Sequence, residues 1–422
     1  MSMRFRRRLL FGLGLIVVSG SLLAWYLRPD PQWAAAEQAL GRRDYAAAYA
    51  LLQDCLTRRR DDPSLLLLTG RTARRAGLFD QAAKHLNAYR RLKGEDPSFT
   101  LEWSLLRLQR GDAAVVSSLK AQARPGRPEA LLIWEVLSQY YLDHYRLFEA
   151  RDCLDSYLEQ RPDDVAALLG RGFIWERLFH YAEAVRDYRR AVQVEPDNER
   201  AHLRLAETLA VTGPPEEAAE QFEWLRRRHP QDLSPRLGLA RCWRQMGRTG
   251  EARQLLDALV AELEGPTPAP GAAGVFTERG RLALEVGELE QAAHWLRRAV
   301  ALAPTDREAL YNFVQCLQQS GQDAEAREYQ ARFQRADADL KRLGQLTKAV
   351  LRQPHDPALR CEVAALFLRN GQEQEGVRWL HLALSEAPDY GPAHQALADY
   401  YQQAGKLELA AHHRELARAR RH

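Results

Sequence analysis

Isoleucine, lysine and cysteine are scarce in this sequence. Only three of its 422 residues are isoleucine, namely Ile16, Ile133 and Ile174, whereas leucine and alanine are abundant. Because isoleucine favours strands and leucine and alanine favour helices, this composition favours an all-α chain. A GC-rich genome would give the same bias. The low share of lysine, six of 60 basic residues, is typical of such a genome. The 46% apolar content excludes a collagen or a disordered polyampholyte, and the five cysteines exclude a disulfide-rich mini-protein.

Motifs for metal, nucleotide or covalent chemistry are also missing. The cysteines form no Cys-x-x-Cys pair, so zinc or thioredoxin-like chemistry has no support, and their odd number disfavours an obligatory disulfide framework. The twelve histidines form no His-Glu-x-x-His motif. Neither a Gly-x-x-x-x-Gly-Lys-[Ser/Thr] loop nor a Gly-x-Ser-x-Gly elbow occurs. We therefore predict that the chain is not an enzyme and holds no metal or cofactor.

The positive charge lies at one end of the chain. The formal net charge is +4, and residues 1–28 hold five arginines and no acidic residue. Residues 29–422 therefore carry 55 basic and 56 acidic side chains, which leaves them close to neutral. Without a basic excess to neutralise phosphates, the main part of the chain is not expected to bind nucleic acid.

An uncharged apolar segment follows the first arginines. Residues 9–27 contain no charged side chain and would span about 28 Å as a helix, close to the thickness of a bilayer core. We predict a transmembrane signal-anchor helix at 9–27, preceded by a basic cytoplasmic N-terminus at 1–8. Four arginines before the span and one after it place the rest of the chain outside the cytoplasm. The alternative is a cleaved secretory signal, which would leave the chain secreted.

Beyond residue 28 the chain repeats itself every 34 residues. Six successive intervals of 34 separate small residues from Ala36 to Ala240, each in the middle of a predicted helix. Later intervals of 40, 34, 50 and 34 indicate insertions of 6 and 16 residues. We call these residues the anchors of eleven repeats; they are Ala36, Gly70, Ser104, Ser138, Gly172, Ala206, Ala240, Gly280, Val314, Ala364 and Ala398.

Glycine, alanine and proline recur at fixed distances from the anchors. Twelve residues after the anchor, nine repeats place alanine, where a small side chain allows two helices to approach closely. Twenty-four residues after it, six repeats place proline, which ends the second helix. Tyr145 and Phe179 replace two turn glycines. Seven residues after the anchor, eight repeats place a glycine that can adopt the left-handed conformation that stops a helix: Gly77, Gly111, Gly213, Gly247, Gly287, Gly321, Gly371 and Gly405.

This pattern resembles the tetratricopeptide repeat (TPR) family over residues 29–422. The copies that match it best are GRGFIWERLFHYAEAVRDYRRAVQVEP at 170–196 and ERGRLALEVGELEQAAHWLRRAVALAP at 278–304. The resemblance implies an all-α fold in which helix pairs stack into a right-handed superhelix, here with one N-terminal transmembrane helix. It also implies a groove that is lined by the first helix of each repeat and binds a segment of a partner.

The repeat register divides the chain into seven predicted segments. After the cytoplasmic N-terminus and the membrane span, repeats 1–7 occupy residues 29–264 and repeats 8–9 occupy 275–340. A loop rich in proline and glycine separates them at 265–274. The larger insertion, at 341–356, is predicted to add a helical turn or two, and repeats 10–11 follow at 357–422.

Thirteen residues on the predicted first helices are candidates for this groove by the same resemblance. They mix both signs of charge with a mild excess of arginine, which suits bidentate recognition of carboxylates, so an acidic peptide segment is the favoured partner. The alternative is that they are ordinary solvated helix positions. The candidates are Arg71, Arg74, Glu135, Gln139, Phe173, Glu176, Arg177, Glu207, Arg241, Arg244, Arg281, Tyr311 and Gln315.

The sequence supports two functional hypotheses. The first is a non-catalytic, membrane-anchored bacterial scaffold that mediates protein–protein interactions and complex assembly outside the cytoplasm. The alternative is an accessory subunit that presents a peptide or polysaccharide substrate to an envelope enzyme or secretion complex. The identity of the partner, the oligomeric state and the pathway stay open at this point.

Overall fold

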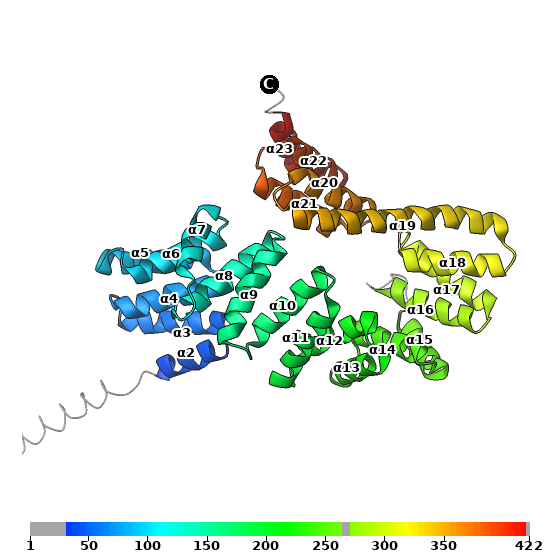
Figure 1. The fold of residues 1–422 in the computed structure, drawn as a ribbon, viewed down its shortest axis with the longest axis horizontal. Helices are drawn as coiled ribbons and strands as arrows, with labels where there is room; N and C mark the ends of the chain where they lie inside the picture. The colour runs from blue at the N-terminus through cyan, green and yellow to red at the C-terminus, as the bar shows by residue number, and fades with distance from the viewer. Residues whose placement is uncertain (1–30, 264–270, 419–422) are drawn as a thin grey trace, which may run out of the picture. The chain divides into compact units, whose positions relative to one another are not determined.

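The computed structural model describes residues 31–263 and 271–418, and every regular element in these ranges is a helix (Figure 1). The predicted N-terminal tail and membrane span lie outside the described residues, as does most of the predicted loop at 265–274. In the ranges that are described, no helix is long and apolar enough to cross a membrane.

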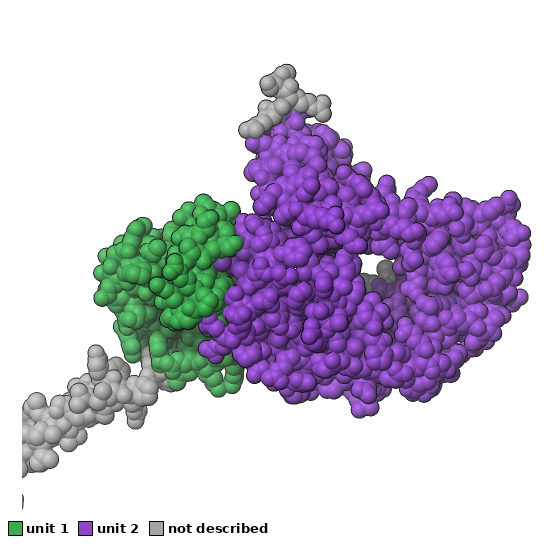
Figure 2. Space-filling model, viewed as in Figure 1, with its two compact units in different colours: residues 1–136 green, residues 137–422 purple. Residues whose placement is uncertain are grey.

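The chain divides into two compact units, residues 1–136 and residues 137–422, which Figure 2 shows in different colours. Helix α8, Ala130–Asp143, contains the boundary. The described elements that precede α8 belong to unit 1, and they are α2 Pro31–Gly41, α3 Tyr45–Arg58, α4 Pro63–Arg75, α5 Phe79–Lys93, α6 Pro97–Gln109, the 3₁₀ turn η1 Ala113–Val115 and α7 Val116–Gln122.

Unit 2 continues the same alternation of first and second helices through repeats 4 to 11. Its elements after α8 are α9 Leu147–Gln160, α10 Val165–Arg177, α11 Tyr181–Val194, α12 Glu199–Thr212, α13 Pro215–Arg228, α14 Leu233–Gln245, α15 Thr249–Leu263, α16 Ala272–Glu285, α17 Leu289–Leu302, α18 Arg307–Gln319, α19 Asp323–Arg352, α20 Pro357–Arg369, α21 Glu373–Glu386, α22 Gly391–Gln403 and α23 Leu407–Arg418.

Aspartates set the start of several first helices. The side chain of Asp96 accepts a hydrogen bond from the backbone N–H of Phe99 at 2.8 Å, and Asp164 does the same for Ala167 at 3.1 Å. Such caps satisfy N–H groups that have no partner within the helix. Tyr89 and Tyr157, each on the second helix of the preceding repeat, also donate hydrogen bonds to Asp96 and Asp164. Each cap therefore links one repeat to the next.

The turn between the two helices of a repeat requires a left-handed residue. Seven of the eight predicted turn glycines have a φ between 71° and 93°. Gly213 is the exception, with a φ of −110° and a ψ of −172°. Pro214 follows it, and a residue before proline is pushed into extended conformations, so the left-handed prediction is wrong at this position. Tyr145 and Phe179 take the glycine positions with φ values of 57° and 62°.

The anchor positions are small because the second helix packs directly on them. A Cβ added at Gly172 would clash with the ring of Tyr188 on α11, which is fully buried. In repeat 8, a Cβ at Gly280 would meet the side chain of Leu296 on α17. The helices of a repeat therefore approach closely where the anchor lies, and they bury the apolar face of the second helix.

Helix α19 departs from the repeat length and positions the functional site described below. It runs without a break for 30 residues, so the insertion predicted at 341–356 extends the second helix of repeat 9 up to Arg352 (Figure 1). Pro354 comes two residues after the end of the helix. The added turns place side chains of α19 on the wall of a cavity that is also lined by helices of repeats 5 and 6, which are far away in the sequence.

Candidate functional site

A cavity of about 640 Å³ lies within unit 2, between segments that are far apart in the sequence. One wall comes from the end of α8 and from α10 and α12, including Phe173, Arg177 and Val211. The opposite wall comes from α19 to α21, including Leu340 and Trp379. We call it the central cavity.

Two further cavities adjoin the central one. A cavity of about 550 Å³ beside α14 shares Glu207 and Val211 with it. A cavity of about 630 Å³ between α18, α19 and α20 shares Leu340, Leu343 and Phe367 with it. The three cavities therefore share walls, and we call them together the groove.

The groove exposes several large apolar side chains. Val211 is 71% exposed, Leu340 53%, Phe179 49% and Leu302 39%. Single exposed apolar side chains are common on protein surfaces, but a cluster of them in a hollow is typical of a binding site.

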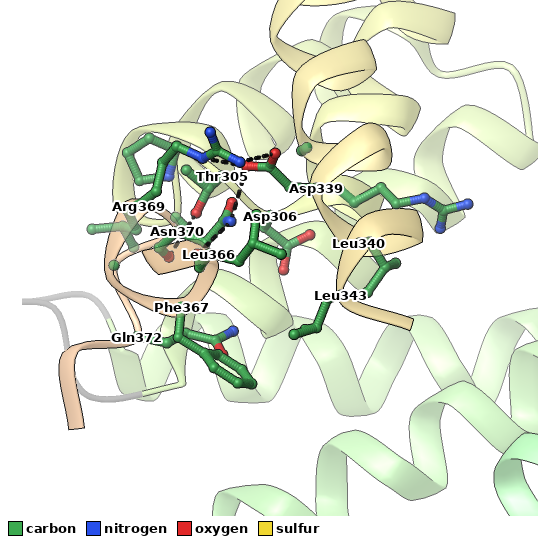
Figure 3. A pocket seen from close by; sticks show the side chains of 16 residues that line it. Thr305, Asp306, Asp339, Leu340, Leu343, Leu366, Phe367, Arg369, Asn370 and Gln372 are labelled. Atoms are coloured by element: carbon green, nitrogen blue, oxygen red, sulfur yellow. Dashed lines mark hydrogen bonds and ion pairs between the residues drawn. The ribbon is translucent and has the colours of Figure 1, made fainter. Parts of the chain in front are cut away.

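Figure 3 shows the cavity between α18, α19 and α20, which polar and apolar side chains line together. The buried carboxylate of Asp339 accepts hydrogen bonds from Arg369 Nε at 2.9 Å and from Asn370 Nδ2 at 3.1 Å. Leu343 and Phe367 lie below these polar groups in the view, and Gln372 lies beside Phe367. Asp339, Arg369 and Asn370 bond one another, so Leu340, Leu343 and Phe367 form the apolar part of the lining.

Most charges in the central cavity are paired within the chain. Arg204 forms ion pairs with Glu176 and Glu207, and Thr208 donates a 2.5 Å hydrogen bond to Glu176. Burial raises the pKa of Glu207, and the charge of Glu176 raises it further. Arg177 differs, because no carboxylate pairs with it in the described part of the chain and its guanidinium lies 4.9 Å from the centre of the Phe173 ring.

The central cavity exists because the C-terminal repeats contact repeat 4. The fully buried guanidinium of Arg360 on α20 donates a 3.0 Å hydrogen bond from Nη2 to the backbone carbonyl of His144. Beside it, the rings of Tyr145 and Trp379 lie 4.6 Å apart between centroids. Arg360 and His144, more than 200 positions apart, are thereby joined. As a result, the first helices of repeats 5 and 6 face α19 across the groove.

Five of the thirteen predicted groove residues line the groove. They are Phe173, Glu176, Arg177, Glu207 and Arg241. The other eight are engaged elsewhere within the chain. Arg71, Arg74 and Glu135 belong to unit 1; Gln139 bonds Asp143, Arg244 and Arg281 pair with glutamates, and Gln315 bonds Tyr311. Whether these eight bind a partner stays a prediction.

Several of these charges join consecutive first helices. In repeats 2 and 7, the arginine four residues after the anchor pairs with the glutamate two residues before the next anchor, as Arg74 with Glu102 and Arg244 with Glu278. Between repeats 5 and 6 the signs are reversed, with Glu176 and Arg204 at the same two positions. Arg74 and Arg244 are only 1% and 7% exposed, so burial removes them from the surface. Opposite charges at these two positions of consecutive repeats could have been found in the sequence by comparing repeats aligned on their anchors.

The residues that sequence reasoning missed lie on the opposite wall. Leu340, Leu343, Phe367, Arg378 and Trp379 come from repeats 9 and 10 and from the extended part of α19. The repeat pattern predicts contacts between neighbouring repeats and gives no signal for a contact between repeats 4 and 10. The described residues contain no group of three or more histidine, cysteine or acidic side chains that could hold a metal ion.

Comparison with known families agrees with this repeat geometry. A family model described as tetratricopeptide repeat matches residues 179–234 and 213–269, and a second model of the same description matches 277–341. The helix pairs of the other described repeats follow the same register. Residues 179–269 and 277–341 therefore match the tetratricopeptide repeat family.

Solved structures of helical repeat proteins are similar over parts of the chain. PilW, a type IV pilus biogenesis factor, is 20% identical over 49% of this chain and 94% of its own, with a TM-score of 0.40. A tetratricopeptide repeat protein from Parabacteroides merdae is 18% identical over 68% and 97%, with a TM-score of 0.33. The protein pilF of Pseudomonas aeruginosa is 17% identical over 58% and 94%, with a TM-score of 0.32. These likenesses carry no conclusion about function.

Proposed function

We propose that this protein is a non-catalytic scaffold that binds a protein partner in the groove of unit 2. The observation that carries the proposal is the exposure of Phe179, Val211, Leu302 and Leu340 on the walls of adjoining cavities. Apolar side chains lose contact with water when a partner covers them, and this supplies the main driving force for association.

The chemistry of the groove supports binding over catalysis. Its acidic groups Glu176 and Glu207 are occupied by Arg204, and Asp339 is occupied by Arg369 and Asn370. A general acid or base must reach a substrate proton, and a carboxylate held by an arginine is poorly placed for this. The mixture of an apolar surface and paired charges is typical of an interface.

The test of this proposal is a variant that blocks the groove without disturbing the fold. Val211→Arg places a bulky cation on a side chain that is already 71% exposed, and we expect it to abolish stoichiometric co-purification of the partner. Val286→Arg is the matched control, because Val286 is also an exposed valine of unit 2, at 44%, and lines none of the three cavities. Equal recovery with both variants would contradict the proposal, and so would retention of polysaccharide without protein.

We also propose that residues 9–27 anchor the protein in a bacterial membrane with residues 29–422 outside the cytoplasm. The uncharged run and the arginines that precede it support this topology. A reporter that folds only outside the cytoplasm, fused after His422, is expected to be active and to sediment with membranes. Activity of a cytoplasmic reporter at the same position would refute the topology, and release of the fusion from membranes would indicate cleavage.

A further inference from the structure

The last repeat holds a pair of histidines whose rings meet through the same nitrogen. His394 on α22 is 5% exposed, and its Nδ1 lies 3.0 Å from Nδ1 of His413 on α23. The other ring nitrogen of His394, Nε2, lies 2.8 Å from the backbone carbonyl oxygen of Pro388. Because a carbonyl oxygen only accepts, Nε2 of His394 carries a hydrogen and donates it.

These contacts assign the hydrogens of the pair. In a neutral imidazole one nitrogen donates and the other accepts, so Nδ1 of His394 is the acceptor and Nδ1 of His413 is the donor. A first added proton goes to Nε2 of His413, which leaves the bond between the rings intact. A second proton goes to Nδ1 of His394, and two N–H groups then point at each other across 3.0 Å. The pair therefore accommodates one added proton but not two.

The surroundings of the pair do not offset a second positive charge. The other titratable and charged groups around it are His381 on α21, Tyr401 on α22, Lys406 between α22 and α23, and His412 and Arg414 on α23. None of these groups is a carboxylate, and in the described part of the chain no acidic side chain forms an ion pair with His394 or His413. Burial lowers the pKa of His413, and the neighbouring histidines lower it further.

Repeat 6 has the same arrangement with glutamine in place of one histidine. His202 stands four residues before its anchor, as His394 does, and its Nε2 lies 3.0 Å from the carbonyl oxygen of Pro196. Its Nδ1 lies 2.7 Å from the side-chain amide of Gln221, which takes the position that His413 has in repeat 11. An amide group offers a donor and an acceptor, so it satisfies the histidine in both protonation states. A second histidine does not.

We propose that this pair makes the last repeat a pH-sensitive switch, in which α23 separates from α22 when both histidines are protonated. Separation returns both rings to water, where histidine has its ordinary pKa of about 6.5. The packed helices bind fewer protons than the separated ones, so packing is strongest above this pKa and weakens as the pH falls below it.

Separation would change the surface of the last repeat. Ala410 on α23 and Leu397 on α22 are fully buried, and α22 and α23 pack against each other, so opening exposes apolar surface to water or to a partner. Neither histidine of the pair lines any of the three cavities. The switch therefore stands or falls independently of the groove.

Hydrogen exchange of the full chain in detergent micelles tests the switch at about pH 7.5 and about pH 5, on either side of the ordinary histidine pKa. Dividing each rate by the intrinsic rate at the same pH removes the direct effect of pH on exchange. We expect the protection of the α23 amides to fall about tenfold at the lower pH, because one additional proton shifts an equilibrium by up to about tenfold per pH unit. The α13 amides, on the helix that carries Gln221, should keep their protection. An equal change in α13 and α23, or no change in either, would contradict the switch.

Two substitutions at neighbouring positions of α23 locate the effect. His413→Gln gives repeat 11 the histidine and glutamine of repeat 6, so the α23 amides should stay protected at both pH values. His412→Gln is the matched control, because His412 is exposed and lies next to the pair, and the fall in protection should persist. A fall that survives in His413→Gln, or that is lost in His412→Gln, would overturn the inference. The comparison of α13 with α23 in the unmodified chain holds even where a substitution loosens α23.

Discussion

Replacing Glu102 by alanine is expected to lower the free energy of local opening in unit 1 by about 3–5 kcal/mol. The Glu102 side chain is fully buried, and its carboxylate accepts hydrogen bonds from Arg71 at 2.6 Å and from Arg74 at 3.0 Å. Arg74 is itself 1% exposed, so the variant leaves a buried guanidinium without a carboxylate. An uncompensated buried charge is among the most destabilising changes that a single substitution can make.

Hydrogen exchange of the α4 and α6 backbone amides measures this effect, since repeat proteins open locally. Glu95→Ala is the control in the same unit: Glu95 is 67% exposed and pairs with Arg90 at 3.2 Å, so the expected loss is about 0.5 kcal/mol or less. Adding Arg74→Met to Glu102→Ala should recover part of the protection, because it removes the unpaired charge. If Glu102→Ala behaved like the control, the buried pair would not hold repeats 2 and 3 together.

Arg360→Met is expected to destabilise the contact between repeats 4 and 10 by about 3 kcal/mol. The guanidinium donates to the carbonyls of Pro354 at 2.5 Å, Leu382 at 3.0 Å and His144 at 3.0 Å, and its Nη2 lies 3.3 Å from the Glu386 carboxylate. Methionine fills most of the volume but donates no hydrogen bond, so several buried acceptors lose their partner.

We expect the amides of α9, α20 and α21 to exchange faster together in Arg360→Met, because they share this contact. Arg342→Met is the control on the neighbouring helix α19, where Arg342 and Glu362 form an ion pair with both side chains about half exposed. Faster exchange confined to α20 would show that Arg360 stabilises only its own repeat and does not close the groove.

The sequence predicted the helices of the repeats well because their determinants are local. A turn glycine or an aspartate cap marks many of the boundaries through its own backbone or hydrogen-bond preference. The spacing of Gly172 and Tyr188 reflects packing within one repeat. Gly213 failed because Pro214 overrides the preference of glycine. The insertion was predicted to be helical, but its continuity with the second helix of repeat 9 was not, because Gly344 lies within α19 without ending it.

The candidate site was predicted only in part, for two physical reasons. The candidates were chosen as first-helix positions one repeat at a time. Arg74 and Arg244, however, form ion pairs with glutamates of the next repeat, and these pairs become visible only when consecutive repeats are compared. The second wall of the groove depends on the contact of Arg360 with the His144 carbonyl, which spans 216 residues and has no periodic signature. Small rotations between successive repeats add up to decide whether distant repeats meet.

Site-specific photo-cross-linking tests most directly whether a protein partner occupies the groove. A photoreactive amino acid at Leu340, which is 53% exposed and belongs to walls of two cavities, is compared in living cells with the same amino acid at Val286 outside them. We expect a single cross-linked protein at position 340, which is absent at position 286 and is lost when Val211→Arg is added. Cross-linking of that protein at position 286 with equal yield, or none at position 340, would contradict it.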